Sequence, residues 1–334
     1  MRRWIKRLLI LAAAIILPPS IILAERGSYA LVVPARRAVQ DYHRAILADQ
    51  SGHGLEVLDF TTPDGTPAMI MLPSSDPGLA TKSRDLRAAL EQRGLTLPPV
   101  GQTVGTIVLL HGRNGRKEDH LPIAERFCAA GFACICIDLP GHGDSPTPYA
   151  TFGHQECHHL PELLAAARKT HHLPAPVALF GYSQGGAIAL QTAAEPGNDC
   201  FAVISIASFA DLGDIVEQRA HSRHPLPDAL ASPCTGLVRL GTRLRAGFDP
   251  ADIRPDLAAA KLSIPVYILH GADDHFIPPT HAQRIYDAVP HPDKRLQIVP
   301  AVAHGNVLST GGTPLYADLC QFLLENVAPV SNRR

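Results

Sequence analysis

Residues 175–194, APVALFGYSQGGAIALQTAA, decide the fold of this chain. A short apolar run, Val177 to Phe180, stops at the turn GYSQGG, and a segment rich in helix formers follows. A turn of the form Gly-x-Ser-x-Gly between a strand and a helix is a nucleophile elbow, which holds a serine at a strained tip above the sheet. We therefore expect Ser183 to act as a nucleophile. The N–H of Gln184, at the positive end of the helix, is expected to face any oxyanion formed beside it.

Short apolar runs alternate with helical segments on both sides of the elbow. They lie at residues 55–60, 68–72, 107–110, 132–137, 177–180, 201–207, 264–271 and 296–299. The turn Pro63-Asp64-Gly65 joins the first two runs into a predicted β-hairpin. This rhythm predicts one α/β domain, with an eight-stranded, mostly parallel sheet flanked by helices. The rhythm is broken by short helices and prolines over 208–262, where we expect a small helical cap.

The composition is that of a globular chain with a large core. Of its 334 residues, 46% are hydrophobic and 5% aromatic, and the formal net charge is −1. Nucleic-acid binding needs a basic surface or aromatic platforms for the bases. We therefore expect no nucleic-acid partner.

The amino terminus differs from the rest of the chain. Residues 2, 3, 6 and 7 are basic, and Leu8 to Ala24 follows without a charge, interrupted by Pro18-Pro19. A basic segment before an apolar one is the layout of a secretory signal or of an N-terminal membrane anchor. We predict one or the other over 1–24, and hence export to the cell envelope, periplasmic or tethered to the membrane. A helix and connector over 25–54 then precede one domain over 55–330.

The cysteines and a run of histidines give no metal-binding pattern. Cys134 and Cys136 alternate along a strand, so both are expected to face one side of the sheet as small core residues. The other five cysteines lack metal-type spacing, and no cysteine or carboxylate pattern completes a site for the histidines of 154–172. These histidines, which are His154, His158, His159, His171 and His172, are predicted to lie on a solvated helix face. One disulfide stays open for an exported chain.

A serine nucleophile needs a base to accept its proton and a carboxylate to orient that base. In an open parallel sheet such groups lie on loops after the carboxyl ends of strands. Two later loops have suitable residues, HGADDHFIP at 270–278 and AHGN at 303–306. The chain order of nucleophile, acid and base is then Ser183, Asp274 and His304, with Asp273 as the second choice for the acid.

Together with HGRNG at 111–115 and DLPGHGDS at 138–145, these motifs make residues 55–327 resemble the α/β-hydrolase family, in its esterase and lipase or serine aminopeptidase-like branches. The resemblance implies the α/β-hydrolase fold and a catalytic triad of Ser183, Asp274 and His304. It also implies an oxyanion hole formed by the N–H groups of Arg113 and Gln184. The activity it implies is cleavage of a small-molecule carboxylic ester through an acyl-enzyme intermediate, with no cofactor and no metal.

Other functions stay open. A peptidase of the same fold is one, because residues 253–274 also resemble aminopeptidase-like and dipeptidyl-peptidase-like members. A cofactor-free haloperoxidase and an acyltransferase use the same triad. A catalytically silent binding protein on this scaffold is the alternative outside enzymes, and the complete set of triad residues argues against it.

Overall fold

The computed structural model describes residues 2–76, 80–171, 173–198, 200–223 and 228–327. His172, residues 224–227 of the predicted cap and residues 328–330 of the predicted domain lie outside this set. The helices, 3₁₀ helices (η) and strands, in chain order, are α1 (Arg2–Val32), α2 (Asp41–Ala48), η1 (Ser51–His53), β1 (Leu55–Thr61), β2 (Pro67–Pro73), α3 (Thr81–Gln92), β3 (Gly105–Leu110), η2 (Lys117–His120), α4 (Leu121–Ala129), β4 (Phe132–Ile137), α5 (Glu156–His171), β5 (Val177–Tyr182), α6 (Gln184–Ala193), β6 (Cys200–Ile206), α7 (Leu212–Arg223), α8 (Asp228–Ala246), η3 (Pro250–Asp252), α9 (Pro255–Ala259), β7 (Val266–Gly271), α10 (Thr280–Ala288), β8 (Lys294–Val299) and α11 (Val307–Asn326).

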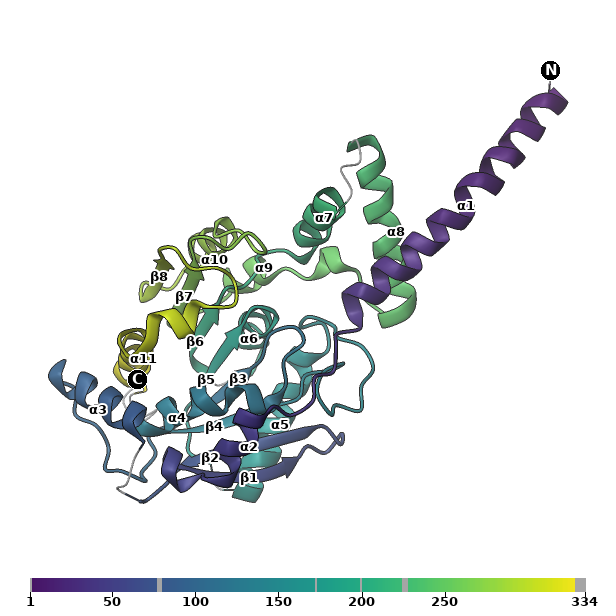
Figure 1. The fold of residues 1–334 in the computed structure, drawn as a ribbon. Helices are drawn as coiled ribbons and strands as arrows, with labels where there is room; N and C mark the ends of the chain where they lie inside the picture. Colours follow the sequence, from purple (N-terminus) through teal and green to yellow (C-terminus); the bar gives the residue numbers. More distant parts are fainter. Residues whose placement is uncertain (1, 77–79, 172, 199, 224–227, 328–334) are drawn as a thin grey trace.

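The strands form one eight-stranded sheet in the order β1-β2-β4-β3-β5-β6-β7-β8 (Figure 1). β2 pairs antiparallel with β1 and with β4, and every other neighbouring pair is parallel. The predicted hairpin and the predicted mostly parallel sheet are thus confirmed. The carboxyl ends of β3 to β8 lie at one edge, where the loops that carry the candidate site begin.

Helices cover both faces of the sheet because successive strand residues point to opposite sides. Ile107 and Leu109 pack on one face with α3, α4 and α11, whereas Val108 packs on the other with α5, α6, α9 and α10. Cys134 and Cys136 lie fully buried on the same face, as their alternation predicts. No disulfide joins the cysteines, all of which lie within the described residues, so the one left open by the sequence is not formed in this structure.

The amino-terminal segment is one long helix. α1 passes through Pro18 and Pro19, which interrupt the apolar run of the sequence, and ends at Val32, so the helix crosses the predicted boundary at residue 24. Each proline removes one N–H from the helical ladder, but the leucine, isoleucine and alanine around them favour helix on both sides. Figure 1 shows the first half of α1 projecting from the body of the protein. Among the described residues, no helix combines the length and the apolar character that crossing a bilayer requires.

The last turns of α1 pack against α8 of the predicted cap (Figure 1). Small residues allow a close approach, since a Cβ on Gly27 would lie 2.5 Å from Val238 Cγ2 and one on Gly241 would lie 2.6 Å from the Ala24 carbonyl oxygen. Arg245 forms an ion pair with Glu25 across the same contact. The cap in space therefore consists of α7, α8 and the end of α1, whereas α9 packs in the helical layer on the sheet.

Candidate active site

β5 delivers Ser183 to the carboxyl edge of the sheet, and α6 begins at the next residue. Ser183 has φ 54° and ψ −115°, a strained conformation for a residue with a side chain. Crowding explains the glycines around it. A Cβ on Gly181 would lie 2.1 Å from the Gly185 carbonyl oxygen, and one on Gly185 would lie 2.0 Å from the Leu110 carbonyl oxygen. The turn has the geometry of a nucleophile elbow.

The structure brings Ser183, Asp274 and His304 together from three separate loops. His304 Nε2 lies 3.0 Å from Ser183 Oγ, and His304 Nδ1 lies 2.6 Å from Asp274 Oδ2. Asp274 is on the loop after β7, and His304 is on the loop after β8. Asp274 is buried, whereas the neighbouring Asp273 is exposed. Asp274 is therefore the carboxylate that orients the imidazole.

Backbone and side-chain donors hold the Asp274 carboxylate. Its Oδ1 accepts the N–H groups of Phe276 at 3.0 Å and Ile277 at 2.9 Å, and its Oδ2 lies 3.1 Å from His270 Nε2. Burial by itself raises the pKa of this carboxyl, but the hydrogen bonds from His270, His304 and the Ile277 N–H outweigh burial and hold the pKa well below its usual range. The group is therefore an ionised acceptor at neutral pH, which keeps the proton on Nδ1 of His304.

His270 also belongs to this site, although the sequence analysis assigned it no role. It lies in β7 and is fully buried. Its Nε2 stands between two acceptors, Asp274 Oδ2 and the Ile277 carbonyl oxygen at 2.8 Å, so Nε2 carries the proton. A signal was present in the sequence, because a polar side chain inside a continuous apolar run needs a buried partner.

The predicted oxyanion donors lie on two turns beside Ser183. A Cβ on Gly112 would lie 3.4 Å from Ser183 Cβ, so the peptide between Gly112 and Arg113 borders the serine. Gln184 is the first residue of α6, and its N–H has no acceptor within that helix. Within the described part of the chain, neither the Arg113 N–H nor the Gln184 N–H has a hydrogen-bond partner. Both are thus available to a developing negative charge.

The side chain of Arg113 binds the end of α1. Its guanidinium donates to the carbonyl oxygens of Leu31 at 2.5 Å and Ala30 at 2.6 Å, and more weakly to that of Val33 at 3.4 Å. The last carbonyls of a helix have no partners within it, and a cation there also interacts favourably with the helix dipole. Burial and the nearby charge of Arg219 lower the pKa of Arg113 to about 10, which leaves it cationic at neutral pH. The turn that carries Arg113 is therefore attached to the amino-terminal helix, α1.

A buried ion-pair network fixes the segment after this turn. The backbone N–H and the Nζ of Lys117 donate to Asp138 at 2.8 and 3.1 Å, and Glu118 pairs with Lys117 at 3.0 Å and with Arg116 at 2.5 Å. Burial alone raises the pKa of Glu118, but its bonds with Arg116 and Lys117 prevail and lower it to about 2. This network holds the turn that carries the Arg113 N–H.

The surface beside the histidine is aromatic and cationic. The ring of Phe276 lies 4.9 Å from that of His304, centroid to centroid, and the Arg219 guanidinium lies 3.7 Å over the Phe276 ring. Phe276 is 43% exposed, so it forms part of the surface that a substrate would meet.

Comparison with known proteins agrees with the fold. Residues 105–240 match the family model described as alpha/beta hydrolase fold, and residues 251–308 match the model described as serine aminopeptidase, S33. The first segment contains the elbow, and the second contains the loops after β7 and β8. Together these matches show that the chain belongs to the α/β-hydrolase family.

Individual relatives are distant. The chain is 25% identical over 189 residues to an uncharacterized protein of Bacillus subtilis, YqkD, in a match that covers 55% of this chain and 60% of that protein. It is 28% identical to a monoacylglycerol lipase of Mycolicibacterium smegmatis, over 60% of this chain and 81% of the lipase. A solved esterase of Pyrococcus furiosus superposes with a TM-score of 0.60 at 15% identity, covering 90% of this chain and 99% of the esterase. A monoglyceride lipase of Saccharomyces cerevisiae gives a TM-score of 0.52 at 16% identity, covering 82% and 96%. At such low sequence identities the two structures support the fold only.

Proposed function

We propose that this protein is a serine hydrolase that cleaves carboxylic esters through an acyl-enzyme intermediate. The observation that carries the proposal is the hydrogen-bonded relay from Ser183 Oγ to His304 at 3.0 Å and from His304 to Asp274 at 2.6 Å. It is supported by the strained backbone of the serine and by the two unpaired N–H groups beside it, because acyl transfer needs an exposed nucleophile and an oxyanion hole.

In the first half of the proposed reaction, Ser183 Oγ attacks the carbonyl carbon of the ester while His304 Nε2 accepts the hydroxyl proton. Asp274 stabilises the imidazolium, and the N–H groups of Arg113 and Gln184 bind the oxyanion. The tetrahedral intermediate collapses as His304 gives its proton to the departing alcohol oxygen. In the second half, water loses a proton to His304 and attacks the acyl carbon, and the acid leaves as Ser183 Oγ regains its proton.

The surroundings of His304 favour an ester over a peptide with a free amino terminus. An ammonium group is best bound by a free carboxylate, but the carboxylate beside His304, Asp274, is buried and already hydrogen-bonded. The exposed neighbour of His304 is the ring of Phe276, which offers no carboxylate. The name of one relative, a monoacylglycerol lipase, supports the same substrate class.

A peptidase is the second candidate, because the serine aminopeptidase model matches the loops of Asp274 and His304. Nitrophenyl esters of short and long acids, assayed beside aminoacyl nitroanilides, separate the two. A higher kcat/KM for the esters supports the proposal, and a preference for the anilides replaces it with a peptidase. An acyltransferase would form a new ester when alcohol is added, and a haloperoxidase would require peroxide for turnover.

The serine itself is tested by labelling and by substitution. A fluorophosphonate probe is expected to react at Ser183, and Ser183→Ala is expected to lose the label and to lower kcat by about a thousandfold or more. Ser309→Ala, at an exposed serine of α11, is the matched control. A Ser183→Ala enzyme that kept more than about a tenth of wild-type turnover would remove Ser183 from the mechanism. A folded wild type without label would indicate a silent binding protein.

We also propose export to the cell envelope, with residues 1–24 acting as a signal peptide or as a membrane anchor. The support is the order of basic residues followed by the uncharged run 8–24. Cell fractionation with amino-terminal sequencing tests this. A product that begins after residue 24 in a soluble envelope fraction indicates a signal, and an intact product in the membrane fraction indicates an anchor. An intact product in the cytoplasm contradicts the proposal.

A further inference from the structure

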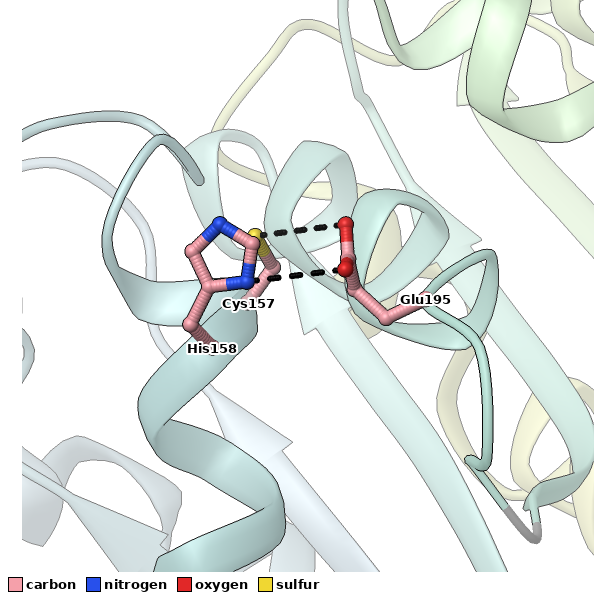
Figure 2. Close-up of side chains that lie close together, drawn as sticks. All are labelled: Cys157, His158 and Glu195. Carbon is pink, nitrogen blue, oxygen red and sulfur yellow. Dashed lines mark hydrogen bonds and ion pairs between the residues drawn. The ribbon is translucent and has the colours of Figure 1, made fainter.

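A cysteine, a histidine and a glutamate meet at the end of α6 that is remote from Ser183. Cys157 and His158 lie in the first turn of α5, and Glu195 follows α6. Figure 2 shows the thiol and the imidazole both facing the Glu195 carboxylate. One donor atom from each residue lies within 4.8 Å of the others, and within the described residues no second group of this kind is found. The sequence did not indicate this cluster because Glu195 lies far from Cys157 and His158 along the chain, in the turn after α6.

The separations suit a tetrahedral zinc ion. Zinc binds thiolate sulfur at about 2.3 Å, imidazole nitrogen at about 2.0–2.1 Å and carboxylate oxygen at about 2.0–2.2 Å, so tetrahedral donors lie roughly 3.4–3.6 Å apart. Cys157 Sγ lies 3.8 Å from Glu195 Oε1, and His158 Nδ1 lies 3.5 Å from Glu195 Oε2. Both distances are close to the spacing of donors around one zinc ion, and all three donor atoms lie within 4.8 Å of one another.

The surroundings of the cluster also suit a cation. Cys157 is 5% exposed, whereas the His158 side chain is 62% exposed, so an ion would be held on its inner side and would keep a solvent-facing position for water. The carboxyl end of α6, where Glu195 lies, carries the partial negative charge of the helix dipole. Glu156 is not a ligand, because its oxygens accept hydrogen bonds from the preceding loop.

The donor set selects the kind of ion. A thiol, an imidazole and a carboxylate suit Zn²⁺, whereas Mg²⁺ and Ca²⁺ prefer sites made of oxygen ligands. Binding would replace the sulfur–hydrogen bond by a sulfur–zinc bond and release one proton to the buffer, with no change of oxidation state.

We propose that Cys157, His158 and Glu195 bind a zinc ion that connects the start of α5 to the end of α6 and keeps one position open to water. α6 has Gln184 at its other end, about 15 Å away for a helix of this length. At that distance the ion takes no direct part in ester cleavage. Its expected effect is on the stability of the α5–α6 pair, which packs on one face of the sheet.

Metal binding is measured on the full chain after treatment with a chelator. Titration with Zn²⁺ by calorimetry is expected to give one ion per chain, with a heat that depends on the buffer because a proton is released. Co²⁺ is expected to give a thiolate-to-cobalt charge-transfer band. Zn²⁺ at a hundredfold excess over Kd should raise the melting temperature by about 4 °C for a chain of this length, and Mg²⁺ and Ca²⁺ should not.

Matched variants identify the ligands. Cys157→Ser, His158→Ala and Glu195→Gln should each lose the zinc-induced rise in melting temperature, and Cys157→Ser should lose the cobalt band. Cys234→Ser in α8 and His159→Ala in α5 are the controls and should bind as the wild type does. Circular dichroism, not hydrolysis, checks the fold, so the result is independent of the proposed esterase activity.

Two results would overturn the zinc site. The first is a wild type that gives neither the cobalt band nor a zinc-dependent melting shift. The second is a band and a shift that persist in His158→Ala, a change at an exposed side chain that leaves folding intact even if Cys157→Ser does not fold.

Discussion

The loops at the carboxyl edge of the sheet and the cap beside them are held in different ways. In the loops, Asp274 is buried among hydrogen-bond donors, and Gly185 has no room for a Cβ atom. In the cap, α8 leaves Leu240 50% exposed and Leu244 81% exposed, and Gly236 has open space around it. We therefore expect almost any substitution at the buried positions of the loops to be harmful, whereas some substitutions in the cap should raise the stability of the protein.

The largest effect is expected at the buried carboxylate. Asp274→Asn would replace an acceptor by an amide that can present a donor to His304 Nδ1, which favours the wrong tautomer of the base. We expect kcat for ester hydrolysis to fall by about 10⁴-fold with the fold intact. Asp273→Asn, one residue away and exposed, is the control and should stay near wild type. Equal losses in both variants would contradict the difference between the two aspartates.

The same substitution in two glycines tests the comparison directly. Gly185→Ala would place a Cβ 2.0 Å from the Leu110 carbonyl oxygen, and we expect it to destabilise the fold by about 1–3 kcal/mol or more. Gly236→Ala lies inside α8 with nothing within 4 Å of the new Cβ, and we expect it to stabilise by about 0.5–1 kcal/mol. Urea unfolding gives both values. A change of the same sign in the two variants would remove the distinction.

A smaller loss is expected when the second histidine is changed. His270→Gln shortens the side chain and weakens the hydrogen bond to Asp274 without touching the substrate. A hydrogen bond to a charged group contributes about 1.5–3 kcal/mol, so kcat should fall by about ten- to a hundredfold while KM stays unchanged. His275→Gln, at an exposed neighbour, is the control. A rise in KM with kcat intact would mean that His270 shapes the binding surface and does not position the acid.

The smallest effect is expected for Glu118, in the dependence of the melting temperature on acidic pH. The folded-state pKa of Glu118 is about 2, below its ordinary 4.5, so its ionised form stabilises the fold fully above pH 4.5, and that contribution disappears as the pH falls toward 2. The melting temperature of the wild type should therefore exceed that of Glu118→Gln at neutral pH, and the two should converge near pH 2. Glu56→Gln, at an exposed glutamate of β1, is the control. Parallel curves for wild type and Glu118→Gln would mean that the ion pairs do not stabilise this turn.

The sequence predicts the sheet and the candidate site because local patterns specify both. Continuous apolar runs located β3, β4 and β5 to within one or two residues. The loops after parallel strands lie at one edge of the sheet. The position of Asp274 and His304 after two later strands therefore predicts that they lie near Ser183, as the structure shows. The donors on the Asp274 loop follow from that same short segment.

The cap and the helix–helix contacts could not be predicted in this way. α1 continues across Pro18-Pro19 and contacts α8 where small residues such as Gly27 and Gly241 meet. No periodic pattern in the sequence indicates which small residues of two distant helices will come together. The approach of Glu195 to Cys157 likewise depends on how two helices lie on the sheet. Such contacts are set by tertiary packing, which a single sequence does not reveal.

Arg113 sets a boundary for trimming of the amino terminus. Cleavage after residue 24 would leave the carbonyls of Ala30, Leu31 and Val33 in place as acceptors for its guanidinium. A cut beyond residue 33 would remove these acceptors and leave the guanidinium of Arg113 without them, beside the peptide that borders Ser183. If the proposed export involves trimming, we expect the position of the cut to affect the proposed esterase activity through this one side chain, with Ser183, Asp274 and His304 left in place.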